Sequence, residues 1–154
     1  MFEGRSVFVR VGFVKVHPDA VMPQYMTSGS SGMDVFAVED VLIIPGTTAK
    51  VRTGFKLVLP EGVEVQVRPR GGTSYKTKMR IANAPGTVDS DFRGEVIVLV
   101  DNIGTVNERI AKGERFAQIV LMRVPKMMMV PVSEDDFASF GTERSDGCLG
   151  STGK

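Results

Sequence analysis

Apolar and polar residues alternate along most of this chain, in short runs that turn residues divide. Between Val7 and Val11, valines at every second position alternate with Phe8 and Arg10, and this period of two predicts a strand over about residues 6–16. Further strands are expected at residues 34–38, 41–44, 48–51, 55–59, 63–68, 95–102, 115–124 and 127–132. Turn signals such as Pro45-Gly46 stand between these runs.

Many short strands at this spacing predict an all-β sandwich, jelly roll or barrel rather than alternating strands and helices. At most one short helix is expected, at residues 73–78. The apolar periodicity is lost from residue 133 onward, so residues 133–154 are expected to form a mobile C-terminal arm on a β core of residues 1–132. No linker divides the 154 residues, of which 42% are hydrophobic, and we therefore expect a single domain, 1–154, with one core.

Composition narrows the range of partners. The net charge is +1 and the 24% of charged residues are interspersed, so no basic stripe favours a polymeric nucleic acid as partner. One cysteine, Cys148, cannot form an internal disulfide, which fits a reducing compartment. The amino terminus does not resemble a signal peptide, and the longest apolar run, 96–100, is too short to cross a bilayer. These features predict a soluble, cytoplasmic protein without a membrane partner.

The segment at residues 83–95 carries the most informative chemistry. It places Asp89, Asp91 and the ring of Phe92 in a turn marked by proline and glycine, between two apolar runs. Such a segment is interpreted as a hairpin whose backbone amides and carbonyls can face a ligand. Asp and Gly also favour turns for structural reasons alone, so this segment by itself leaves both interpretations open.

Two earlier segments have a similar double interpretation. Residues 31–37 place Asp34 at the start of a strand, where a carboxylate either serves a site or caps a turn. In residues 68–74, a predicted strand ends and a double glycine follows it. Backbone amides and the two-pronged donor of Arg70 can therefore converge on an anion. An ordinary glycine turn with solvated arginines explains the second segment equally well.

Two later segments complete the set. Residues 108–118 alternate charged and apolar side chains, as a hairpin with one wet face does. Residues 144–154 combine glycines, hydroxyls and Lys154, which suit oxyanions, but the spacing from Gly147 to Gly153 does not match a P-loop. Taken alone, a terminus of this composition is typical of disorder.

In their order and spacing, the five segments resemble the motifs of the homotrimeric dUTP pyrophosphatase (dUTPase) family. The corresponding residues are 31–37, 68–74, 83–95, 108–118 and 144–153. The resemblance implies a distorted jelly-roll or β-clip barrel, and hydrolysis of dUTP to dUMP and pyrophosphate in nucleotide metabolism. It also implies Mg²⁺ as cofactor and a homotrimer whose active sites are shared between subunits.

The resemblance assigns roles to individual residues. Asp89 would be the general base that activates the water attacking the α-phosphorus, and Asp34 would hold the water shell of Mg²⁺. Phe92 stands where the family usually has a tyrosine, whose ring excludes a ribose 2′-hydroxyl. The other substrate-binding residues implied are Asn83, Thr87, Val88 and Ile97 for uracil, Arg70, Gly71, Gly72, Gln118 and Arg144 for the triphosphate, and Leu149, Gly150, Ser151 and Thr152 of the closing arm.

Three positions depart from the family pattern. Gly71 replaces a serine that contacts the phosphates, so this contact must come from the backbone, Thr73 or Ser74, or be absent. Leu149 replaces an aromatic residue that stacks on uracil, and Cys148 replaces a glycine beside it. Leucine covers a base by dispersion but lacks a π face, so arm closure is expected to stabilise the complex less.

Two alternatives stay open. A dCTP deaminase-like enzyme shares the fold and similar phosphate motifs, although the run from Val88 to Phe92 places an aspartate where a dUTPase has its water-activating residue. A non-catalytic nucleotide-binding or interaction module could be built on the same trimer. Release of ammonia from dCTP would indicate the first alternative, and binding without turnover the second.

Overall fold

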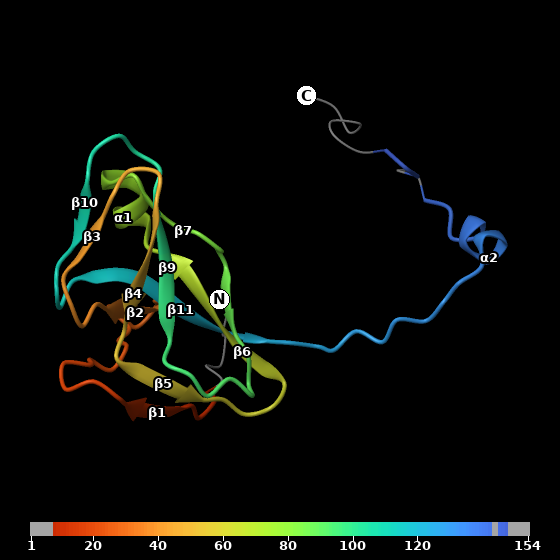
Figure 1. The fold of residues 1–154 in the computed structure, drawn as a ribbon. Helices are drawn as coiled ribbons and strands as arrows, with labels where there is room; N and C mark the ends of the chain where they lie inside the picture. The colour runs from red at the N-terminus through yellow and green to blue at the C-terminus, as the bar shows by residue number, and fades with distance from the viewer. Residues whose placement is uncertain (1–7, 143–144, 148–154) are drawn as a thin grey trace.

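A computed structural model describes residues 8–142 and 145–147, and it places most of them in an all-β body from which the C-terminal segment extends (Figure 1). The strands are β1 (Gly12–Lys15), β2 (Met33–Phe36), β3 (Val41–Ile43), β4 (Thr48–Arg52), β5 (Phe55–Val58), β6 (Val63–Pro69), β7 (Met79–Ile81), β8 (Gly86–Val88), β9 (Ile97–Asn102), β10 (Glu108–Ile110) and β11 (Arg115–Arg123). Two short helices are α1 (Gly71–Lys76) and α2 (Glu134–Ala138). The all-β prediction is confirmed.

The strands pair antiparallel in four groups, and most partners are distant in sequence. The largest sheet has the order β2-β11-β6-β8, a second has the order β4-β9-β7, and β1-β5 and β10-β3 form pairs. Because β11 lies between β2 and β6, the late part of the chain closes the sheet that the early part opens. These long-range pairings are those of a jelly roll rather than of a simple meander.

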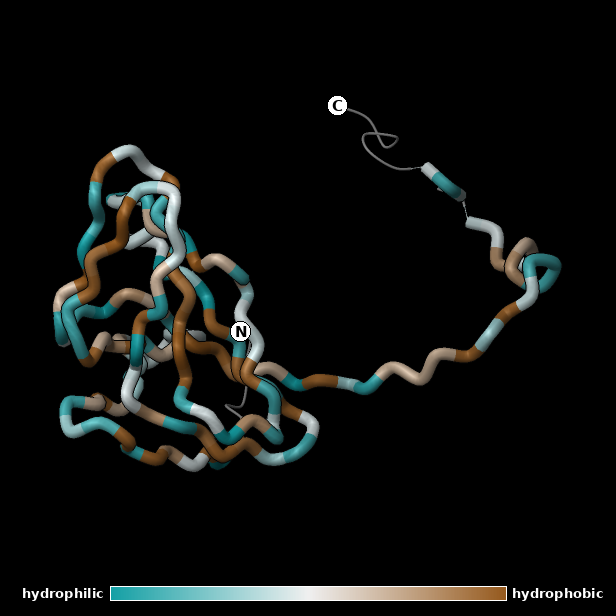
Figure 2. The backbone as a smooth tube through the Cα atoms, viewed as in Figure 1, coloured by the Kyte–Doolittle hydropathy of each residue, from teal (hydrophilic) through white to brown (hydrophobic). Residues whose placement is uncertain are grey.

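The core lies between the sheets and follows the alternation of the strands. In β6, Val63, Val65 and Val67 are buried, while the polar residues between them face outward. Phe55 and Phe116 are almost fully buried, each contributing about 1.5–3 kcal/mol relative to an exposed side chain. In Figure 2 the hydrophobic positions gather along the strands of the body, with polar turns at its margins.

A β-bulge in β11 changes which side chains share a face. Arg115 pairs with Phe36 and Ala117 with Val35, so Phe116 is the extra residue on this strand, and Gln118 then stands opposite Asp34. Phe116 and Ala117 are consecutive and both buried, which strict alternation would not allow. The bulge thereby brings Arg115 to the same side of the sheet as Gln118.

The segment at residues 83–95 is more than the hairpin expected from its sequence. Strands β7 and β9 do pair with each other, with Ile81 opposite Val100. The connection between them, however, contains β8, which joins β6 in the other sheet and places Thr87 opposite Gln66. The segment therefore ties the two sheets together.

Other element boundaries also differ from the prediction. The first strand is shorter than expected, at Gly12–Lys15, and α1 begins at Gly71 instead of residue 73. The prediction of a strand at residues 127–132 is wrong, because this segment has no strand partner within the described ranges and Met127 is 89% exposed. A strand requires a neighbour for its backbone hydrogen bonds.

Helix α2 is a second helix where at most one was expected. Ser133 caps it, with its hydroxyl accepting from the backbone amide of Asp136 at 3.1 Å, and acidic residues fill the first turn. In Figure 1 α2 lies well away from the β body. Over the described ranges, no helix is long and apolar enough to cross a membrane.

Candidate functional site

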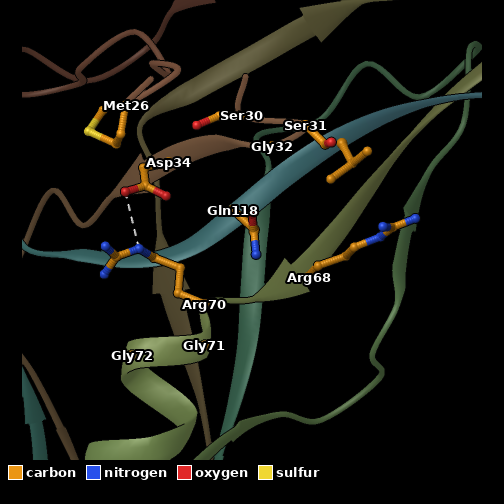
Figure 3. Close-up of a pocket in the computed structure, with 11 residues that line it drawn as sticks. Met26, Ser30, Ser31, Gly32, Asp34, Arg68, Arg70, Gly71, Gly72 and Gln118 are labelled. Atoms are coloured by element: carbon orange, nitrogen blue, oxygen red, sulfur yellow. Dashed lines mark ion pairs between the residues drawn. The ribbon is translucent and has the colours of Figure 1, made fainter. Parts of the chain in front are cut away.

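A pocket of about 390 Å³ opens on the outer face of the large sheet, beside the start of α1 (Figure 3). Asp34 of β2, Gln118 of β11 and Arg68 of β6 stand in one row across three paired strands, so their side chains lie on the same face. The lining residues are Met26, Ser30, Ser31, Gly32, Asp34, Arg68, Arg70, Gly71, Gly72, Gln118 and Val120. We call this the arginine pocket.

Two guanidinium groups hold the carboxylate of Asp34. Arg70 Nε lies 3.1 Å and Arg115 Nη1 lies 3.3 Å from the same oxygen, Oδ2. Arg70 is itself positioned by Arg115, because its Nη1 donates to the main-chain carbonyl of Arg115 at 2.7 Å. Asp34 is only 7% exposed, so this cluster is fixed in place. Two cations around one carboxylate leave a positive surplus, which suits an anionic ligand.

Hydrogen bonds also orient the other polar side chains of the arginine pocket, Gln118 and Arg68. Gln118 Nε2 donates to the carbonyl of Pro69 at 2.9 Å. Arg68 donates to Gln66 Oε1, a neutral acceptor, at 2.7 and 3.1 Å, and in Figure 3 its side chain points away from Asp34. Space is open above Gly71 and Gly72, since a β-carbon at either position would meet nothing within 4 Å. Their backbone is therefore accessible to a ligand.

The residues expected to handle the base, the sugar and the water lie elsewhere on the chain. Asn83, Thr87, Asp89, Phe92 and Ile97 are exposed and Val88 is buried. Asp89 lines a second pocket of about 470 Å³ together with Glu61, Glu64, Asp91 and Lys126. This pocket shares no lining residue with the arginine pocket. A third pocket, of about 410 Å³, joins Arg68 and Gln118 to Ala84 and Pro85, so among the described residues only the Asp89 end of the segment is apart from the arginine pocket.

A compact turn presents Asp89. The backbone amide of Phe92 donates to the Asp89 carbonyl at 3.2 Å, and Arg93 Nη1 donates to the carbonyls of Ser90 at 2.7 Å and Phe92 at 2.9 Å. All of these bonds use backbone acceptors, so the exposed carboxylate of Asp89 is left available to solvent or ligand. The turn fixes where the carboxylate lies without occupying it.

Glu95 anchors the end of the same segment to β4. Arg52 Nη2 and Nε donate to its carboxylate at 2.9 and 3.2 Å, and the Gly54 amide donates at 2.8 Å. Burial alone would raise the pKa of Glu95, but these hydrogen bonds outweigh it and hold the pKa below its usual value. Glu95 also raises the pKa of Arg52. The charged pair thus ties the segment to the body.

Three residues in or beside the arginine pocket are not predicted by the sequence: Met26 and Arg68 line it, and Arg115 contacts Asp34 at its edge. Arg115 lies within the segment 108–118, but strict alternation would place it on the opposite face from Gln118, and only the bulge reverses this. Its Nη1 also lies 2.8 Å from Met26 Sδ, in a loop without a sequence signal. Arg68 belongs to the second segment and could have been found from the outward positions of β6.

Five expected site residues lie outside the described residues. They are Arg144, Leu149, Gly150, Ser151 and Thr152, and the substituted Cys148 falls there too.

The carboxylates of the described chain do not form an inner-sphere metal cage. Among the described residues no group of three or more His, Cys, Asp or Glu side chains could hold a metal ion. Within the part of the chain that the structure describes, Asp34 is the sole carboxylate that lines the arginine pocket. A single carboxylate fits a Mg²⁺ ion that keeps most of its waters and takes its other ligands from a substrate.

The structure is an all-β body with an arginine-lined pocket and an aspartate-bearing turn, and comparisons with known proteins specify the family. A family model described as dUTPase matches residues 19–153, and the chain therefore belongs to the dUTPase family. The chain is 44% identical over 140 residues to the deoxyuridine 5′-triphosphate nucleotidohydrolase of Hydrogenobaculum sp., covering 90% of this chain and 94% of that protein. It is 41% identical over 146 residues to the protein of the same name from Wolinella succinogenes, covering 95% of each chain.

Solved structures agree on the fold. A mutant dUTPase of Staphylococcus bacteriophage 80alpha with dUpNHpp superposes with a TM-score of 0.82 at 24% identity, over 94% of this chain and 99% of that one. A mutant dUTPase from phage phi11 of S. aureus, in which a structural Mg(II) ion is described, gives a TM-score of 0.77 at 20% identity over 82% of this chain and 98% of that one. At these identities the likeness concerns the fold alone.

Proposed function

We propose that this chain hydrolyses dUTP to dUMP and pyrophosphate, and so serves nucleotide metabolism. Membership of the dUTPase family over residues 19–153 supports the proposal. The observation that carries it is the meeting of Asp34, Arg70 and Gln118, from three distant segments, in one cationic pocket. A positively charged pocket favours the binding of a triphosphate over that of a neutral ligand.

The arginine pocket binds the triphosphate. Arg70 supplies a planar two-pronged donor, and Gln118 supplies an amide from the neighbouring strand. Thr73 and Ser74, which could have replaced the missing serine at position 71, line a different small cavity beside Met79. The phosphate contact at this position therefore falls to the backbone of Gly71 and Gly72, above which space is open.

Asp89 positions and activates the attacking water. Its exposed carboxylate accepts a proton as the water oxygen bonds to the α-phosphorus of dUTP. The bond from the α-phosphorus to the bridging oxygen breaks, and pyrophosphate leaves with that oxygen. The turn closed by Arg93 fixes the backbone that carries Asp89, so the reaction gains from orientation.

The segment around Asp89 selects the nucleoside. Asn83, with the backbone at Thr87, Val88 and Ile97, reads the polar edge of uracil by hydrogen bonds. Cytosine presents the opposite pattern of donors and acceptors, and a site built around buried hydrogen bonds rejects such an analogue by about 10⁴-fold or more. Phe92 packs against the deoxyribose and excludes a ribose 2′-hydroxyl.

Asp34 is the residue that would hold Mg²⁺, through its water shell. A bound Mg²⁺ would neutralise charge on the phosphate oxygens. The ion pairs of both guanidinium groups are made with Oδ2 of Asp34, and we assign the other oxygen, Oδ1, to the ion's waters. Arg70 and Arg115 keep that carboxylate oriented.

The complete site forms between subunits of a homotrimer. The Asp89 pocket and the arginine pocket share no lining residue among the described residues, which supports a site that takes its groups from more than one chain. Arg144 and the arm residues Leu149, Gly150, Ser151 and Thr152 complete the enclosure of the nucleotide. The exposed apolar segment that begins at Met127 supports an assembly in which further surface is covered.

The decisive measurement is pyrophosphate release from dUTP, dCTP, dTTP and UTP, each with and without Mg²⁺. Strong preference for dUTP in the presence of Mg²⁺ is the expected result. Ammonia released from dCTP would replace the proposal with a deaminase, while tight nucleotide binding without any product would indicate a non-catalytic binding module. Cleavage of UTP as fast as dUTP would show that Phe92 does not exclude the ribose 2′-hydroxyl.

A further inference from the structure

The ring of Phe92 lies directly over Gly94. A β-carbon built on residue 94 would overlap the ring atom Cζ and would lie only 2.9 Å from Cε2 and 3.2 Å from Cε1. Only a residue without a side chain fits beneath the ring in this position. Phe92 is still 44% exposed, so another part of its surface is available to a ligand.

The constraint at residue 94 is steric and not conformational. Among the described glycines, those with positive φ are Gly46, Gly54, Gly62 and Gly113, and Gly94 is not one of them. Alanine can therefore adopt the backbone conformation of residue 94 without strain. Among the described residues, the three atoms nearest to such a methyl group all belong to the ring of Phe92.

The ring is the part that would move if a methyl group were added. The backbone of the turn is held by the Phe92 amide on the Asp89 carbonyl and by Arg93 on two carbonyls, at 2.7 to 3.2 Å. The aromatic ring, in contrast, turns about its side-chain torsions and no described hydrogen bond fixes it. A methyl group at residue 94 would consequently lift the ring and leave the Asp89 backbone in place.

We propose that Gly94 is a positioning residue for sugar specificity. Because it has no side chain, the Phe92 ring can pack against residue 94, and in that position the ring leaves room for deoxyribose but not for ribose. The inference rests on the proposed function, in which Phe92 faces the sugar. Gly94 itself touches no substrate and acts through the ring. A larger residue at position 94 would push the ring toward the sugar and would crowd deoxyribose as well.

The main test is Gly94→Ala with steady-state kinetics on dUTP and UTP. The KM for dUTP should rise by about tenfold, the usual effect of a misfit of one methyl group in a binding pocket, while kcat stays near that of the unchanged protein. The unchanged protein already excludes UTP, so kcat/KM for UTP should change little. The ratio of kcat/KM for dUTP to that for UTP should therefore fall by about the same factor as kcat/KM for dUTP. A merely structural role would lower activity on both substrates equally.

A double-variant cycle with Phe92→Ala tests whether the effect passes through the ring. In the Phe92→Ala background, Gly94→Ala should change neither KM nor the sugar ratio, because the added methyl group then meets no ring. Gly29→Ala is the matched control, since a β-carbon at residue 29 meets nothing within 4 Å, and it should leave all constants unchanged. If Gly94→Ala alone does not fold, the double variant should fold, because its methyl group has room.

Several results would overturn the inference: an unchanged KM and sugar ratio in Gly94→Ala, an equal effect of Gly94→Ala with and without the ring, or failure of both variants to fold. Calorimetric affinities for dUMP and UMP measure the same preference without turnover. If dUTP is not hydrolysed but Gly94→Ala still weakens the preference for dUMP over UMP, the proposed reaction is wrong and the role of Gly94 stands. If dUTP is hydrolysed and that preference is unchanged, only the role of Gly94 is wrong.

Discussion

The amide oxygen of Gln118 occupies the space in which a β-carbon on Gly32 would lie. A β-carbon there would overlap Oε1 and would lie 3.1 Å from Cδ of the same amide. Gly32 is buried on the loop that enters β2, next to Asp34 in the arginine pocket. The position of Gln118 therefore depends on the absence of a side chain one strand away.

Gly32→Ala is expected to displace the Gln118 amide and break its bond to the Pro69 carbonyl. Loss of one such hydrogen bond corresponds to about 1 kcal/mol, so the KM for dUTP should rise roughly fivefold. Steady-state kinetics measure the change, with Gly29→Ala as the control that adds the same methyl group in open space. An unaltered KM would mean that Gln118 does not bind the substrate in this orientation.

Asp89→Asn is expected to remove the general base and leave the nucleotide pocket intact. Pyrophosphate release should fall by about 10²- to 10⁴-fold, the typical contribution of a positioned base. Affinity for a non-hydrolysed dUTP analogue, measured by calorimetry, should stay within a small factor. Asp40→Asn serves as control, because Asp40 is exposed and pairs only with Arg109 and the Lys112 amide among the described residues. Undiminished turnover of Asp89→Asn would remove the assigned base.

Mixing two inactive variants tests the shared site. Asp89→Asn and Arg70→Gln are each expected to be inactive alone, but a trimer that contains both can join an intact Asp89 to an intact Arg70 across an interface. Random mixing in equal amounts should restore about a quarter of the sites, because each of the two required residues is intact with a probability of one half. The variants are unfolded together, refolded and assayed, and a mixture that stays inactive would place both residues in one chain's site.

The ion pair between Arg52 and Glu95 predicts a pH dependence of stability. The pKa of Glu95 is lower in the folded protein than its usual value of 4.5, so its stabilisation is complete above pH 4.5 and is lost as the pH falls through the folded value. Arg52→Met should lower the free energy of unfolding at pH 7, because Glu95, which is only 15% exposed, then loses its charged partner.

Chemical denaturation at pH 7 and at pH 4 measures this effect. The difference between the original protein and Arg52→Met should shrink at the lower pH, where Glu95 begins to take up a proton. Arg109→Met is the matched control, because it breaks an ion pair with Asp40 in which both side chains are more than half exposed, and it should change stability by less than about 0.5 kcal/mol. A constant difference between the two pH values would contradict the role of Glu95.

Sequence reasoning predicted the strands best where the pattern was local. The run at residues 63–68 alternates so regularly that β6 and its inward valines are found almost as predicted. The segment at residues 127–132 is more apolar still but forms no strand, because composition does not supply a neighbour for its backbone. The helix α2 was missed, although Ser133 and the three acidic residues after it are a readable helix start.

The candidate site was predicted in its members but not in its arrangement. Asp34, Arg70 and Gln118 were named from their segments, and the structure brings them together in the arginine pocket. Arg115 was not named, because its place on the same face depends on a bulge that alternation alone cannot reveal. The separation of Asp89 from this pocket was equally invisible in the sequence.

The sequence by itself determined the alternation, the turns and the residue types that chemistry requires, because these depend on neighbours a few positions apart. Only the tertiary structure decided that β11 lies between β2 and β6, that β8 crosses to the larger sheet, and that a ring rests on Gly94. Such relationships join residues far apart in the chain, and they are fixed by strand register and close packing, which no local pattern encodes.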